Sequence, residues 1–389
     1  MAEIKSFKGL RYHNVDFQKV ITPPYDVIDD DMKKKFRELS GYNFVNLILN
    51  ENHNKANELL NEWIKEKIIV QDDKDSLYIY QQEFNLQGNI IKRTGFVCLL
   101  KLEEFGENIL PHEKTFDKYI KDRYDLMRKT QCNLENIFLI YEDKEKEIDN
   151  LLIPKIENNE DIKFVDSDNC IHRIWKVDDE DTVSKIISLM NDKKLLIADG
   201  HHRYKTALKY KKKHGGNYVM ATLVNSFNEG MVILPTNRLL NNKVDIEDFN
   251  EYFDAEETNE INELDEKSFI VATKEKKWSI KLKNEEILNE IFKGREIFKD
   301  LDVATLHKLI FEKILDISLD EQKPPKIKFI KGNKFTLDSI DDSNTAFFVR
   351  PPSLEQTFKI AIKGKVMPQK STYFYPKMFS GLVIYKWSG

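Results

Sequence analysis

The chain has 389 residues, of which 41% are hydrophobic and 33% charged, so it can form a folded core and has room for two or three domains of roughly 150 residues. The 61 Lys and Arg residues against 66 Asp and Glu give a net charge of −5, which lacks the overall basic character that duplex nucleic acid requires. No apolar run approaches about 18 residues, and no apolar segment follows the N-terminal Met. We therefore expect a cytoplasmic protein that binds neither nucleic acid nor membrane.

The three cysteines, Cys98, Cys132 and Cys170, are far apart in the sequence and odd in number. Neither a disulfide framework nor a zinc site of the CxxC type can be built from them. We expect three buried thiols and no structural zinc.

The first half of the chain mixes helix and strand signals. After a Pro-Pro turn at 22–26, Met32, Phe36 and Leu39 share one face of an expected helix. The hydrophobic pattern predicts further helices at 57–67, 116–130 and 181–190, and strands at 77–84, 90–102, 136–141, 171–177 and 195–198. The Gln87-Gly88-Asn89 segment between the first two strands favours a hairpin.

The second half predicts a separate lobe and a β-rich end. Residues 243–320 are rich in acidic residues, with weak strands within 268–283 and a helix that carries Val303, Leu306, Ile310 and Ile314 on one face. After the Lys-Pro-Pro-Lys segment at 323–326, strands are expected at 327–331, 346–350, 357–362 and 382–386. The predicted class is α+β with a mixed sheet: a core at 1–242 with an insertion between about 41 and 190, an α/β lobe at 243–322, and a β segment at 323–389 that packs back on the core.

The strongest functional signal is a buried strand at 195–198 that runs through Asp199 and Gly200 into a helix. Glycine permits close backbone approach, and a helix N-terminus offers N–H groups and the positive end of its dipole to an anion. Arg203 can add a bidentate clamp, and His201 and His202 add donors that titrate near neutral pH. The alternative is that Asp199 only caps the helix and the histidines lie on its surface.

Two other segments carry candidate acids and bases. Two prolines fix Asp26 before a helix, where its carboxylate can act as a base, as a magnesium ligand or only as a turn residue. His112 and Glu113 are a further acid/base pair or a structural one, and HExxH is absent because position 116 is Phe. Arg123, on the helix that follows, can supply positive charge.

The fourth segment is 367–377. Lys370, Ser371 and Thr372 look like the end of a Walker A motif, but the upstream glycine is not at the required spacing, so a P-loop is rejected. These residues can still bind phosphate or carboxylate from a loop, and the alternative is an aromatic edge strand. Arg238 is expected to be an ion-pair partner.

These segments resemble a known family. The strings at 7–12, 23–27, 112–115, 199–204, 234–238 and 368–377 occur in the order seen in a bacterial and archaeal domain-of-unknown-function family, numbered one thousand and fifteen in its series. The resemblance covers nearly the whole chain, and its Asp-Gly-His-His-Arg-Tyr string is specific. Family membership by itself implies no activity.

A more distant likeness implies a function. The strand, turn and helix around Gly200 look like the nucleotide-binding element of the ParB/sulfiredoxin superfamily, which includes free serine kinases that use ADP as phosphoryl donor. The resemblance implies that the turn, with Gly200, His201, His202 and Arg203, holds nucleotide phosphates. It also implies that Asp199 is a catalytic or Mg²⁺-binding carboxylate and that Asp26 stands near the acidic residue before the first helix. In the superfamily domain these two segments are much closer in sequence than they are here.

We therefore predict a nucleotide-dependent phosphotransferase that uses ATP or ADP with Mg²⁺ and acts on a small hydroxy or amino acid, serine first. Its expected partners are this substrate and the nucleotide. The catalytic candidates are Asp199, His202, Glu113 and Asp26; the cofactor-binding candidates are Gly200, His201, Arg203, Lys370, Ser371 and Thr372; the substrate-binding candidates are His112, Arg123 and Tyr25. A nucleotide-binding regulator without turnover and a phosphate-ester hydrolase are the alternatives.

Overall fold

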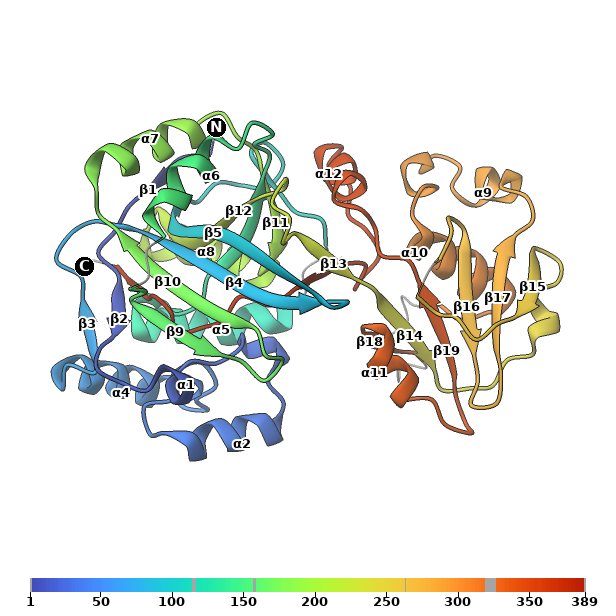
Figure 1. The fold of residues 1–389 in the computed structure, drawn as a ribbon, viewed down its shortest axis with the longest axis horizontal. Helices are drawn as coiled ribbons and strands as arrows, with labels where there is room; N and C mark the ends of the chain where they lie inside the picture. The colour runs from blue at the N-terminus through green and yellow to red at the C-terminus, as the bar shows by residue number, and fades with distance from the viewer. Residues whose placement is uncertain (1, 114–116, 157–158, 263, 319–326, 388–389) are drawn as a thin grey trace. The chain divides into compact units, whose positions relative to one another are not determined.

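The computed structural model describes residues 2–113, 117–156, 159–262, 264–318 and 327–387, and its chain forms two compact units. The first unit comprises Met1–Pro111, Thr115–Val232 and Pro376–Gly389, and the second comprises His112–Lys114 and Ile233–Tyr375 (Figure 1). The segment expected at 323–389 as one block is therefore divided between the units. Its Lys-Pro-Pro-Lys start lies outside the described residues, as does the first residue of the helix expected at 116–130.

The first unit is built on a hairpin. Strands β4 (Leu77–Leu86) and β5 (Asn89–Lys101) pair antiparallel, and the two residues between them, Gln87 and Gly88, both have positive φ, of 52° and 89°. Two positive φ values are what a tight two-residue hairpin turn requires, because its twist then matches that of the strands. The predicted hairpin is confirmed.

This hairpin lies in a large mixed sheet. Its strand order is β6 (Ile109–Leu110), β11 (Leu195–Asp199), β8 (Ile137–Tyr141), β12 (Tyr218–Asn225), β5, β4, β10 (Ile171–Val177) and β9 (Ile162–Val165), with β1 (Ile4–Lys5) also on β5. The pairs β11–β6 and β12–β8 are parallel and the others antiparallel. Two small pairs are β2 (Leu10–Tyr12) with β3 (Ile69–Gln71), and β7 (Cys132–Asn133) with β21 (Tyr385–Lys386).

Helices cover this sheet. They are α1 (Phe17–Val20), η1 (Tyr25–Val27), α2 (Asp30–Leu39), α3 (Val45–Ile48), α4 (His53–Lys65), α5 (Asp117–Thr130), α6 (Glu147–Leu152), η2 (Ile153–Lys155), α7 (Glu180–Met190) and α8 (His201–His214). In Figure 1, α6 and α7 lie above the sheet, and α1, α2 and α4 lie below it. Apolar side chains of α5, α6, α7 and α8 join those of the central strands in one buried core. The three cysteines are buried thiols, as expected.

The second unit has an antiparallel sheet with a core on each face. The strand order is β15 (Phe253–Glu257), β17 (Lys277–Leu282), β16 (Ser268–Ala272), β19 (Thr345–Val349), β14 (Thr236–Leu240) and β18 (Ile327–Lys331). Alternate residues of β16 point to opposite faces: Phe269 and Val271 belong to one core, and Ile270 and Ala272 to the other. β13 (Val232–Leu234) pairs with β20 (Tyr373–Tyr375) in a separate two-stranded sheet.

The helices of the second unit are η3 (Ile246–Phe249), α9 (Glu286–Ile291), η4 (Glu296–Phe298), α10 (Asp302–Thr305), the π-helical η5 (Leu306–Ile314), α11 (Asn333–Asp338) and α12 (Leu354–Ile362). The helix predicted on Val303, Leu306, Ile310 and Ile314 is confirmed, and it becomes π-helical from Leu306. Among the described residues, no helix is long and apolar enough to cross a membrane.

One predicted strand is wrong: residues 357–362 belong to α12. The helix begins with a capping box, in which Ser353 Oγ accepts from the backbone N–H of Gln356 and Gln356 Oε1 accepts from that of Ser353. This reciprocal cap satisfies the orphan N–H groups of the first turn and favours helix over strand. The strand expected at 382–386 is also shorter, since β21 contains only Tyr385 and Lys386.

Close packing of β5 against β12 gives a test of the sheet. A Cβ added to Gly95 would press on the carbonyl oxygen of Leu223 and on Val224 Cγ2 at less than van der Waals separation. We expect Gly95→Ala to lower the free energy of unfolding by roughly 1–3 kcal/mol, the usual cost of overpacking. Gly41→Ala is the control, because no atom lies within 4 Å of its added Cβ. Equal denaturant midpoints for the two variants would contradict this packing.

Candidate functional site

The turn between β11 and α8 leaves a helix N-terminus without a side-chain cap. Gly200 occupies the cap position with φ at 94° and has no side chain with which to cap the helix. A Cβ at Gly200 would also stand 3.1 Å from Nε of Arg203, so the guanidinium packs directly on this glycine. Glycine is needed here both for the backbone conformation and for the close approach. The alternative that Asp199 caps the helix does not match this geometry.

Asp199 instead lies between two cations. Its Oδ2 accepts from Nη2 of Arg203 at 2.6 Å, and its Oδ1 accepts from Nζ of Lys377 at 2.7 Å. The Asp199, Arg203 and Lys377 side chains are only 10–16% exposed. Nη1 of Arg203 also donates to the backbone carbonyl of Asn136. We call Asp199, Arg203 and Lys377 the ionic triad.

The charges of the ionic triad hold one another ionised. Burial opposes the charge on Asp199, but Lys377 and Arg203, and then His201, hold the pKa of Asp199 well below its usual range. Burial likewise opposes the charge on Arg203, yet Asp199, Glu135 and Asp26 together raise the pKa of Arg203. Asp199 is therefore a poor proton acceptor, and its carboxylate fixes the positions of two cations.

A second polar group lies beside Arg203, around Glu135. The backbone N–H of Tyr25 and the Oγ of Ser380 each donate to Glu135 Oε1 at 3.1 Å. Nη1 of Arg123 lies 3.6 Å from Glu135 Oε2, and its guanidinium lies 4.3 Å from the centre of the Tyr25 ring. That Nη1 is buried and has no hydrogen-bond acceptor among the described residues.

A small cavity of about 30 Å³ connects these groups, with Arg123, Glu135, Arg203 and Thr206 among its lining residues. Its volume suits one water molecule. Asp26 also interacts electrostatically with Arg203, since its negative charge raises the pKa of Arg203. The structure thus brings together the predicted residues Tyr25, Asp26, Arg123 and Arg203 with Asp199 in the first unit.

Sequence reasoning missed Lys377 and Glu135. Lys377 is the last residue of the segment 367–377, in which the sequence marks only residues 370–372 as candidate ligand contacts. Nothing in the sequence relates Lys377 to Asp199. Glu135 precedes a wholly buried strand, β8, and is itself only 8% exposed. A carboxylate beside such an apolar run is a signal that could have marked it, since buried carboxylates need partners.

The predicted residues His201 and His202 open α8 in the first unit, and the predicted residues at 112–113 and 370–372 lie in the second unit. Nε2 of His112 and Oγ1 of Thr372 share a hydrogen bond of 2.8 Å, and the backbone N–H of Lys370 donates to Glu113 Oε1 at 3.4 Å. Ser371 Oγ donates to the carbonyl of Pro368 at 2.5 Å. The structure therefore joins the segments around 112 and 370, as a group within one unit.

Arg238 donates to the backbone of this second group. Contrary to expectation, it has no ion pair among the described residues. It is fully buried, and its partners are Nε2 of His307 at 2.9 Å and the carbonyls of Thr236, Gln369 and Lys370. Burial lowers the pKa of Arg238 far below its ordinary value. Its guanidinium positions the loop that carries Lys370.

The fold and site define a mixed α/β protein with a buried ionic triad at an uncapped helix N-terminus. Residues 4–304 match the family model described as "Protein of unknown function (DUF1015)", and the chain belongs to this family. The resemblance inferred from the sequence strings is thereby confirmed. No curated protein sequence matches the chain.

Several solved structures are distantly similar. One is a variant of a free serine kinase in complex with ADP, with a TM-score of 0.36 and 14% identity, over 71% of this chain and 92% of that one. Another is SbnI with C-terminal truncation from Staphylococcus aureus, with a TM-score of 0.38 and 11% identity, over 73% of this chain and 85% of that one. A third is a conserved hypothetical protein from Pyrococcus furiosus, with a TM-score of 0.30 and 15% identity, over 71% of this chain and 95% of that one.

The ionic triad predicts a specific dependence of stability on pH. Asp199→Asn removes the carboxylate that pairs with both Arg203 and Lys377, so we expect it to lower the free energy of unfolding by roughly 2–3 kcal/mol at neutral pH. Because folding depresses the pKa of Asp199, its contribution is present above the pKa of the unfolded chain, about 4, and is lost as pH falls further.

Urea unfolding of both proteins at several pH values measures this difference. The exposed Asp192 supplies the control, and Asp192→Asn is expected to change little at any pH. A difference between wild type and Asp199→Asn that stays constant from neutral pH to below pH 4 would show that the carboxylate does not carry the stabilisation.

Proposed function

We propose that the first unit binds the phosphate groups of a nucleotide at the N-terminus of α8, and that the protein is a nucleotide-dependent phosphotransferase. One observation carries the proposal: α8 starts at a left-handed glycine without a side-chain cap, beside the buried cations of the ionic triad. Backbone N–H groups at such a helix end point at a ligand, and the helix dipole favours negative charge there.

The cations can serve an anion without leaving Asp199. Asp199 fixes the positions of Arg203 and Lys377, each of which donates to it, and the positive charges of both side chains attract phosphate oxygens. Such fixed charges need no reorganisation when negative charge develops, which is how phosphoryl transfer is mainly catalysed.

The acid–base roles follow from exposure and pairing. Both oxygens of Asp199 are engaged by cations, whereas Asp26 on η1 is exposed and its charge reaches Arg203. We assign Asp26 to orient or deprotonate the acceptor hydroxyl, and Asp199 to position the triad. Asp26 also has the oxygen donors that Mg²⁺ prefers, and a bound Mg²⁺ would neutralise charge on the phosphates; Asp199 could join it only by giving up an ion pair.

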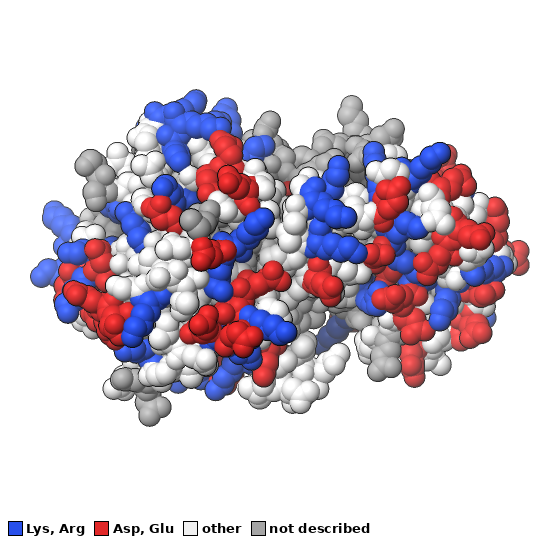
Figure 2. Space-filling model, turned by 90° about the horizontal axis from the view of Figure 1, so that it is seen from above, with Lys and Arg blue, Asp and Glu red and all other residues white. Residues whose placement is uncertain are grey.

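The acceptor in this proposal is a small hydroxy or amino acid, and serine is tested first because of the superfamily that the sequence resembles. His201 and His202 open α8 and stay predicted phosphate contacts. Glu113 stays a predicted catalytic residue, His112 a predicted substrate contact, and Lys370, Ser371 and Thr372 predicted cofactor contacts; all five lie in the second unit. On the face drawn in Figure 2, basic and acidic side chains are interspersed, which suits a small-molecule ligand better than a long polyanion.

Binding is tested by thermal unfolding with ATP, ADP, AMP and inorganic phosphate, each with and without Mg²⁺. A ligand that binds only the folded state stabilises it by about 2.7 kcal/mol at 100 times its Kd. We expect a nucleotide to raise the melting temperature and Lys377→Met to abolish the rise. Lys212→Met is the control, because it removes an exposed charge from the other end of α8. No rise with any nucleotide at millimolar concentration would refute the site.

Turnover is tested with ATP or ADP, Mg²⁺ and serine, followed by a wider set of hydroxy and amino acids. We expect a phosphorylated acceptor, and a kcat that falls roughly 100-fold or more in Asp26→Asn while the nucleotide Kd measured without Mg²⁺ stays unchanged. Asp31→Asn, at an exposed carboxylate in the first turn of α2, is the matched control.

The two alternatives give different results in the same assay. Nucleotide binding with no product from any acceptor would indicate a regulator. Both oxygens of Asp199 accept hydrogen bonds from cations, and a carboxylate held in this way suits a protein that binds a nucleotide without turnover. Phosphate release without an acceptor would indicate a hydrolase. Either outcome would refute the phosphotransferase while leaving the binding site in place.

A further inference from the structure

A side-chain cluster far in sequence from the α8 turn has the composition of a metal site. It lies at the β9–β10 hairpin, whose turn is organised by Asp166. Asp166 Oδ1 accepts the backbone N–H groups of Asp168 at 2.8 Å and Cys170 at 2.9 Å, and Asn169 takes a left-handed φ of 61°. These contacts engage one carboxylate oxygen in the turn and direct the other, Oδ2, towards His172.

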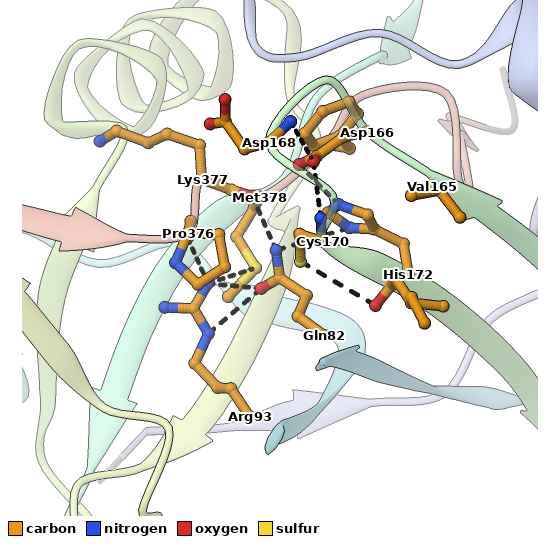
Figure 3. Close-up of polar contacts among 12 residues, drawn as sticks. Gln82, Arg93, Val165, Asp166, Asp168, Cys170, His172, Pro376, Lys377 and Met378 are labelled. Carbon is orange, nitrogen blue, oxygen red and sulfur yellow. Dashed lines mark hydrogen bonds and ion pairs between the residues drawn. The ribbon is translucent and has the colours of Figure 1, made fainter. Parts of the chain in front are cut away.

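Three different ligand types converge at this point. Oδ2 of Asp166 lies 3.1 Å from Nε2 of His172, and one donor atom each from Asp166, Cys170 and His172 lie within 4.8 Å of one another. Figure 3 shows the three side chains meeting beside the turn. Donor atoms around a tetrahedral zinc ion are roughly 3.2–3.7 Å apart, given metal–ligand distances of about 2.0–2.3 Å, so a small contraction would complete the site.

We propose that Asp166, Cys170 and His172 bind a zinc-class divalent cation, with water at the fourth position. Thiolate, imidazole and carboxylate are the ligands that Zn²⁺ takes in proteins, and three protein ligands with one open position is a known arrangement. On binding, the Cys170 thiol loses its proton to solvent and a sulfur–metal bond forms. The imidazole proton moves from Nε2, where it faces Asp166 Oδ2, to Nδ1, where Tyr80 Oη can accept it, so that Nε2 is free to bind the metal. The thiolate and the carboxylate then balance the two positive charges, so the buried site becomes neutral.

The surroundings hold the histidine ready for this role. Tyr80 Oη lies 2.7 Å from Nδ1 of His172, so the second ring nitrogen has a partner and Nε2 faces the cluster. Phe164 stacks on the imidazole at 4.5 Å and 7°, and Phe379 lies at 4.5 Å on a tilted plane. Burial lowers the pKa of His172, which keeps the imidazole neutral and able to bind a metal. Such outer contacts fix ring orientation in metal sites.

Nearby charges act in both directions. Burial, and then the negative charge of Asp166, raise the pKa of the Cys170 thiol to about 12, and the positive charge of Arg93 offsets only part of this rise, so the thiolate forms when a metal displaces the proton. Arg93 also adds to the burial that lowers the pKa of His172, although its positive charge opposes a bound cation. Arg93 is held by Gln82 Oε1 and the carbonyl of Pro376 (Figure 3). Asp166 and Asp168 add negative charge on the turn side. The turn at 167–169 beside the ligands is exposed.

The test uses the full-length protein, stripped with a chelator and titrated with Co²⁺ as a spectroscopic probe and with Zn²⁺. We expect one ion per chain and the near-ultraviolet charge-transfer absorption of a cobalt–thiolate bond, which zinc then displaces. Cys170→Ser should abolish the absorption. Cys132→Ser is the matched control, a thiol equally buried in the same unit, and should retain it.

Two further variants keep the proposal testable if Cys170→Ser fails to fold, as judged by circular dichroism. Asp166→Asn keeps the oxygen that organises the turn but removes the ligand charge, and it should weaken cobalt binding at least tenfold. Tyr80→Phe removes the outer contact to Nδ1 and should weaken it roughly 10–100-fold.

A folded wild-type protein that takes up no metal, or an absorption that survives Cys170→Ser, would overturn the proposal. So would unchanged affinity in Asp166→Asn. These results do not depend on nucleotide binding, because no member of this cluster belongs to the ionic triad.

Discussion

The buried pairing of Asp199 with Arg203 and Lys377 is the interaction on which the site in the first unit depends. Two cations and one carboxylate out of water carry a large desolvation cost, which only close mutual contacts offset. The contacts at 2.6 and 2.7 Å do this, and they join the start of α8 to a residue near the C-terminus. The site therefore exists only when the segment that carries Lys377 lies against the start of α8.

The C-terminal segment that brings Lys377 is held by backbone pairing rather than by a helix or a long strand. Ser380 and Thr22 exchange two backbone hydrogen bonds, and Ile384 and Leu10 do the same. Beside Lys377, the buried side chain of Gln82 donates to its carbonyl at 2.8 Å. Gln82 also lies 3.5 Å from His172 Nδ1, so the proposed metal cluster and the backbone of Lys377 share one polar neighbour.

The two units handle buried positive charge in opposite ways. In the first unit, Arg203 has a carboxylate partner and stays strongly charged, as its raised pKa shows. In the second, Arg238 has a neutral imidazole and backbone carbonyls as its partners, and burial lowers its pKa. The first arrangement presents a fixed charge at the end of a helix, while the second fixes the shape of the loop at 368–372.

Local patterns determined much of what the sequence could indicate. The hairpin at Gln87 and Gly88, the strand–glycine–helix at 195–208 and the helix beginning near 303 follow from turn chemistry and apolar periodicity, which act between near neighbours. Residues 357–362 show the limit of this reasoning, because their apolar pattern suits strand and helix alike and the capping box at Ser353 decided for the helix.

Only the tertiary structure decided which distant side chains meet. Lys377 reaches Asp199, Glu135 reaches Tyr25 and Cys170 joins His172 and Asp166 because the sheet order and the returning C-terminal segment place them together, and no local pattern encodes a pairing between such distant strands.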